Sequence, residues 1–175
     1  MALIVEDGTG VAGADGYVTV DYADTYFSQL ARADWAVYPL ASKQAALRKG
    51  AAYLGMVYAG RWKGSRVSSI QPLDWPRTGV ELTLGNTPYT LPSDVIPAAI
   101  LIAQCELAST AMTAELIPSD PGGVRVKRQK VDVLEIEYAD SSSFQTAKYP
   151  AIDMRVAPYL SDSKRSASVG VVERA

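Results

Sequence analysis

The sequence predicts a mainly α-helical fold, a bundle of three to four helices with a projecting β-ribbon and extended termini. Apolar residues recur at helical spacing in four segments, and Pro or Gly residues stand near the ends of those segments. Between residues 124 and 138, apolar residues instead alternate with charged ones, which is typical of strands. The 175 residues suit one domain, which we place at residues 1–160, followed by an extended C-terminal tail at residues 161–175.

The first half of the chain predicts two helices behind an extended start. Residues 1–18 are rich in Gly and Asp, which favours turns. Thr19 is a predicted N-cap, so the first helix should cover about residues 20–32. A second helix is expected over about residues 40–58, with Lys43 on its solvent face. Its core stripe consists of Leu47, Ala51, Leu54 and Tyr58.

Residues 60–93 are predicted to be irregular, and a loop of this length is usually functional or packed by its own side chains. Trp62 and Trp75 are expected to anchor it to the helices. An alternative is that Trp62, Trp75 and Arg77 stack on nucleic-acid bases, as aromatic residues do in single-strand binders. Burial of Trp75 is favoured because Pro76 biases the preceding residue toward an extended backbone.

Two further helices are expected in the second half. Pro97 suits the first turn of a helix that should run to about residue 116. Apolar residues cover most of its circumference, which predicts a central helix buried within the subunit and against neighbouring subunits. Cys105 lies in this helix and is expected to be an inert core thiol. A short helix is expected over about residues 150–160.

The ribbon at residues 124–138 reverses its charge halfway along. Four cations precede the acidic residues: Arg125, Lys127, Arg128 and Lys130. Such a ribbon could grip DNA, pair with itself as a hairpin, or clasp a neighbouring subunit, and the low net charge and missing catalytic groups favour the clasp. The alternation of apolar and charged residues is broken at Val133 and Leu134, where two apolar residues are adjacent. This break predicts a bulge or bend there.

Composition excludes several classes of function. The formal net charge of −2 means that any contact with DNA must come from a local patch. The chain contains no histidine, which removes Ser-His-Asp catalysis and His-ligated metals, so we expect no enzyme and no cofactor. One cysteine cannot form an intrachain disulfide, which favours a reducing compartment. No secretory signal and no apolar run of about 18 residues is found, so no membrane partner is expected.

Several segments together resemble a known tailed-phage family. They are the opening ALIVEDGTG, the loop Gln71-Pro72-Leu73-Asp74-Trp75-Pro76-Arg77-Thr78-Gly79, the helix containing Cys105-Glu106-Leu107-Ala108, and the ribbon Val126-Lys127-Arg128 to Leu134-Glu135-Ile136-Glu137-Tyr138. The family is labelled as DnaT-like single-stranded-DNA-binding proteins. It is similar in size and helix layout to phage head-to-tail adaptors, also called head-completion or connector proteins. The resemblance covers about residues 1–160, and the tail departs from it.

The resemblance implies a structural virion protein, assembled in the host cytoplasm and located at the head–tail neck. Its partners would be further copies of itself in a ring, twelve-fold in the adaptors it resembles. They would also include the portal protein, a tail-side component, and double-stranded DNA passing through the channel. A single-stranded-DNA-binding accessory protein is the alternative.

Three groups of residues are candidates for these contacts. The candidates for the DNA channel are Arg125, Lys127, Arg128 and Lys130. The candidates for the subunit interface are Asp132, Glu135, Glu137, Leu134, Ile136 and Tyr138. The candidates for portal docking, on the tail, are Val169, Val171, Val172 and Arg174.

Overall fold

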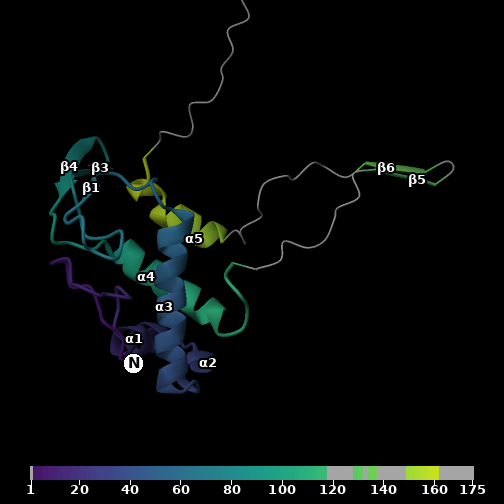
Figure 1. Ribbon diagram of the computed structural model, residues 1–175, viewed down its shortest axis with the longest axis horizontal. Coiled ribbons are helices and arrows are strands. Elements are labelled where there is room, and N and C mark those ends of the chain that lie inside the picture. Colours follow the sequence, from purple (N-terminus) through teal and green to yellow (C-terminus); the bar gives the residue numbers. More distant parts are fainter. Residues whose placement is uncertain (1, 118–127, 132–133, 138–148, 162–175) are drawn as a thin grey trace, which may run out of the picture.

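Two long helices cross at the centre of the fold. The computed structural model describes residues 2–117, 128–131, 134–137 and 149–161. Helix α3 (Leu40–Val57) crosses α4 (Ala98–Ala111), and α5 (Pro150–Val156) packs against α4 (Figure 1). Helices α1 (Val20–Gln29) and α2 (Ala33–Ala36) lie together beside one end of α3, and a 3-10 turn (Ala157–Tyr159) follows α5.

Short antiparallel sheets complete the described part of the chain, so the fold is mixed rather than mainly helical. Strands β1 (Ser65–Arg66) and β2 (Arg77–Thr78) form one pair, and β3 (Val80–Leu84) and β4 (Thr87–Leu91) form a hairpin. A further hairpin consists of β5 (Arg128–Val131) and β6 (Leu134–Glu137), which is drawn apart from the helices in Figure 1. The prediction of a helical bundle with a ribbon is therefore correct only in part.

The predicted helices are present, with ends set by local chemistry. Thr19 caps α1 as expected, since its side chain accepts a hydrogen bond from the Tyr22 backbone N–H. Pro97 directly precedes α4, where its missing N–H costs nothing. Helix α4 ends at Ala111, sooner than the predicted residue 116. Residues 60–93 were wrongly expected to lack regular structure, because β1 to β4 lie within them.

Helices α3 and α4 separate two groups of buried side chains. One group lies toward the β3–β4 hairpin and α5 and includes Trp62, Trp75, Ile100 and Leu107. The other lies toward α1 and α2 and includes Phe27, Trp35, Leu47 and Cys105. Both groups use residues of α4, which confirms the prediction of a central helix.

The N-terminal segment is organised by a buried carboxylate. Glu6 is almost fully buried, and its two carboxylate oxygens accept hydrogen bonds from the backbone N–H groups of Gly8, Gly10 and Val11. These bonds offset the cost of burying the charge. Gly8 adopts a positive φ of 104°, and a Cβ there would lie 1.9 Å from the Asp94 carbonyl oxygen.

We predict that Leu107→Ala destabilises the protein by about 2–5 kcal/mol, because it leaves a cavity in the core between α3 and α4. Leu107 is fully buried. Chemical denaturation would measure the change in the free energy of unfolding. Met56→Ala is the control, since Met56 lies on the exposed side of α3 and its truncation should cost no more than about 0.5 kcal/mol. Equal losses in the two variants would contradict this placement of α4.

We also predict that Cys105 resists thiol reagents in the native protein. Burial raises the pKa of the Cys105 thiol to about 12, so very little reactive thiolate exists at pH 8. Labelling with a colorimetric disulfide reagent should be at least about a hundredfold slower in buffer than in denaturant. Rapid native labelling would mean that the core around α4 is open.

Candidate interaction surfaces

The structure describes the backbone of six candidate residues, all of them in the β5–β6 hairpin. These are Arg128, Lys130, Leu134, Glu135, Ile136 and Glu137. The remaining candidates lie outside the described residues: Arg125, Lys127, Asp132, Tyr138, Val169, Val171, Val172 and Arg174. Only the hairpin therefore brings predicted site residues together.

The register of the hairpin separates charged from apolar residues. Residues directly opposite in an antiparallel pair share a face, and successive residues alternate between faces. One face therefore carries Arg128 opposite Glu137 and Lys130 opposite Glu135. The other face carries Gln129 opposite Ile136 and Val131 opposite Leu134. The basic strand thus pairs with the acidic strand of its own chain, which is the second of the three interpretations that the sequence left open.

The phase shift in the apolar pattern coincides with the reversal of the chain. Val131 is the partner of Leu134, so the chain turns back between them. The bulge or bend expected next to Leu134 is therefore the connection between two strands rather than an irregularity inside one.

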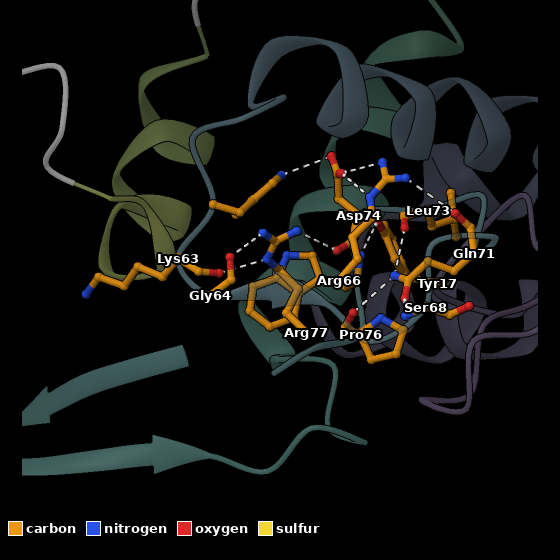
Figure 2. Close-up of polar contacts among 12 residues, drawn as sticks. Tyr17, Lys63, Gly64, Arg66, Ser68, Gln71, Leu73, Asp74, Pro76 and Arg77 are labelled. Carbon is orange, nitrogen blue, oxygen red and sulfur yellow. Dashed lines mark hydrogen bonds and ion pairs between the residues drawn. The ribbon is translucent and has the colours of Figure 1, made fainter. Parts of the chain in front are cut away.

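A buried polar network organises the loop between α3 and β3 (Figure 2). The Asp74 carboxylate accepts hydrogen bonds from Trp62 Nε1 at 3.1 Å and from Arg66 Nη2 at 2.7 Å. The Gln71 side chain accepts from the Ser68 backbone N–H and donates to the carbonyls of Leu73 and Pro76. These bonds tie residues 66–76 to the start of the loop.

Arg77 closes the same network from the other side. Its guanidinium donates to three backbone carbonyls, those of Lys63 at 2.7 Å, Gly64 at 2.7 Å and Asp74 at 3.1 Å (Figure 2). Burial lowers the pKa of Arg77 below its usual value. Three carbonyl partners compensate for this desolvation, so Arg77 acts as an internal cross-link of the loop.

The two loop tryptophans are core anchors, as the sequence predicts. Trp62 is 6% exposed and Trp75 is fully buried, and their ring centroids lie 5.8 Å apart in an edge-to-face arrangement. With Arg77 also buried, none of the three side chains is available to stack on a base in this conformation. The alternative of an aromatic platform at this loop is therefore not supported.

A hollow lies where α1 and α2 meet the start of α3. Its volume is about 560 Å³, and its lining consists of Asp24, Phe27, Ser28, Ala31, Arg32, Ala33, Trp35, Ala36 and Lys43. Asp24 Oδ1 accepts hydrogen bonds from Trp35 Nε1 at 2.6 Å and from Lys43 Nζ at 2.9 Å. The expectation that Lys43 faces solvent is wrong, because α2 covers this part of α3 and leaves the Lys43 side chain 9% exposed.

Three exposed apolar residues stand beside this hollow in the sequence. Leu30, Val37 and Leu40 flank the lining residues 31–36 and are 50%, 79% and 61% exposed. We call the hollow together with these three residues the α1–α2 corner. No motif in the sequence indicates it, because it arises from the packing of a four-residue helix that periodicity cannot reveal.

Metal-binding clusters and membrane-spanning helices are absent from the described parts of the chain. Among those residues, no group of three or more His, Cys, Asp or Glu side chains is placed to hold a metal ion. No helix within the described ranges is long and apolar enough to cross a membrane.

One family model matches the chain over residues 1–175, and its description reads "Putative DnaT-like ssDNA binding protein". No curated protein and no solved structure matches the chain. The match spans the buried loop network as well as the hairpin, so it covers both features described above.

We predict that Arg77→Met lowers the free energy of unfolding by about 3 kcal/mol or more, because it leaves one buried and two partly buried carbonyls without their donor. Arg77→Lys should also be destabilising, since an ammonium cannot reproduce the planar fork. Arg61→Met is the matched control. Arg61 lies over the Tyr58 ring at 5.4 Å, and its loss should cost about 1 kcal/mol or less. Denaturant titration followed by tryptophan fluorescence would compare them, and an unaffected Arg77 variant would contradict a structural role.

Proposed function

The chain belongs to the family of DnaT-like ssDNA binding proteins, and from that premise we propose that it is a head-to-tail adaptor of a tailed-phage virion. In this proposal its subunits form a ring beneath the portal protein, continue the DNA channel and offer a platform to the next tail component. Double-stranded DNA passes through the ring without being held by base-specific contacts.

The observation that carries the proposal is the charge-sorted hairpin. Arg128 and Lys130 lie opposite Glu137 and Glu135, so the cations of β5 are matched within their own chain. Matched charges leave a weak positive field, which suits a passage for DNA better than a tight grip. The apolar face of the same hairpin remains for a protein contact.

The packing of α4 moves the expected ring contact toward the hairpin. From the sequence, the helix at residues 96–116 and the ribbon at residues 124–138 were expected to carry the ring contact. In the structure, Ile100, Ala103 and Leu107 of α4 are fully buried within their own subunit. These side chains are therefore not available to a neighbouring subunit, and the hairpin becomes the better candidate for the ring contact. In a ring this contact is heterologous, which means that two different faces of the subunit meet.

Residues of the tail keep their predicted role in this proposal. Val169, Val171, Val172 and Arg174 are the candidates for docking to the portal, and they lie outside the described residues. A segment that folds only on docking would take on its ordering cost at that step.

A single-stranded-DNA-binding accessory protein is the second candidate, and the family description favours it. The cations at residues 125–130 would provide its contacts with phosphates. Burial of Trp62 and Trp75 removes the described aromatic platforms that such binding commonly uses.

We predict that negative-stain images of virions, and of the protein mixed with portal protein, show a ring of this protein directly beneath the portal. In parallel, fluorescence anisotropy of a labelled single-stranded oligonucleotide should report only weak binding that disappears with added salt. A variant with Arg125, Lys127 and Arg128 all changed to Ala should still form the ring. Absence of the protein from virions, together with tight oligonucleotide binding that this variant loses, would replace the adaptor by the accessory protein.

A further inference from the structure

The apolar face of the β5–β6 hairpin has no partner sheet in the described chain. Two-stranded hairpins are marginally stable in water on their own and need an apolar face covered by another element. Val131, Leu134 and Ile136 share that face, while the charged residues share the opposite one. We propose that this face docks into the α1–α2 corner of a second copy of the same chain.

The corner has the shape and chemistry to accept such a face. It combines a hollow of about 560 Å³, within the usual range of about 300–1,000 Å³ for binding pockets, with apolar side chains on its floor. Phe27 and Trp35 form that floor with ring centroids 4.7 Å apart, and both are buried. Val37 directly follows the lining residues in the sequence and is 79% exposed, so it is available to a partner.

Electrostatics favour the contact because no unpaired charge would be buried. Each cation of the corner already has its own carboxylate: Lys43 binds Asp24 at 2.9 Å and Arg32 binds Asp34 at 3.0 Å. The docking face of the hairpin carries Gln129 and apolar residues only. An uncharged face meeting internally paired charges leaves no buried charge without a partner, which is the costliest case.

The length of chain around the hairpin lets it reach a neighbour. Ten residues, 118–127, separate it from the described residues before it, and eleven, 138–148, from those after it. Each connection can span at most about 33–40 Å when extended, which exceeds the radius of a domain of this size. The hollow is lined by residues between 24 and 43 and by none from the hairpin.

A hairpin of one copy in the corner of the next joins two different surfaces, so the contact propagates head to tail and closes into a ring. This inference rests on the proposed ring assembly and names the two surfaces that would build it. It also gives the exposed apolar residues Leu30, Val37 and Leu40 a role in assembly.

Mixing two differently damaged variants tests the contact on the full-length chain. Leu134→Asp damages the hairpin face and Val37→Asp damages the corner, and each should weaken self-association on the order of thirtyfold or more. An equimolar mixture should form a heterodimer and nothing larger, because one intact hairpin meets one intact corner. Met154→Asp is the control, since Met154 is 73% exposed on α5, and it should associate like the unaltered protein. Size-exclusion chromatography with light scattering gives the masses.

Cysteine cross-linking decides the case in which the free protein is largely monomeric. A chain carrying both Val37→Cys and Leu134→Cys should form a ladder of disulfide-linked multimers on mild oxidation, while buried Cys105 stays unreacted. A chain carrying Leu134→Cys with Met154→Cys should not. A cross-linked monomer would mean that the hairpin docks on its own corner, and no cross-link at all would mean that it docks elsewhere; either result overturns the inference. Virion rings that form normally from the Leu134→Asp variant would overturn it and leave the adaptor proposal standing.

Discussion

The fold depends on the close crossing of α3 and α4 at Gly50. A Cβ at this position would lie 2.8 Å from the Gln104 carbonyl oxygen, so only glycine permits the approach. The fully buried Gln104 side chain then links three segments, since it donates to the Leu47 carbonyl and accepts from the Tyr17 backbone N–H. The N-terminal segment, α3 and α4 are thereby held in one arrangement, and the two buried clusters form on either side of it.

A second constraint fixes the loop that follows α3. This loop has little regular structure of its own, so its shape comes from buried polar side chains rather than from a strand ladder. Asp74 and Arg77 belong to the same network but have different partners. Asp74 accepts hydrogen bonds from an indole and a guanidinium, whereas Arg77 donates to three backbone carbonyls. Gln71, Asp74 and Arg77 are hydrogen-bonded in this network, while the buried Trp75 Nε1 has no partner among the described residues. The paired groups favour one arrangement, because each of them would be costly to leave unpaired. These hydrogen bonds explain why the polar residues Gln71, Asp74 and Arg77 can be buried around Trp75.

The sequence predicted elements whose signals are local and missed those that arise from packing. Helical periodicity with Thr19 and Pro97 located α1 and α4, and alternation located the β5–β6 hairpin. The β3–β4 hairpin was missed although Gly85 adopts the positive φ of its turn, because Pro88 within a strand argues against one. The charge pairing of β5 with β6 depends on where the chain reverses, which the pattern alone left open. The α1–α2 corner carries no motif, since its hollow depends on how α2 sits against α3.

Several charges of the described helical body are paired within it, and this bears on where function resides. Asp15, Asp24, Asp74 and Glu115 each hold a cation from another part of the chain. Aromatic and cationic groups that could contact nucleic acid at the central loop are used inside it. The central loop therefore holds the fold together, and the apolar hollow of the body lies elsewhere, at the α1–α2 corner. The hairpin differs: its register sets the charged residues on one face and the apolar residues on the other, and no further described strand joins it. In the proposed adaptor, recognition would therefore rest on the surfaces where burial is incomplete, which are the hairpin and the α1–α2 corner.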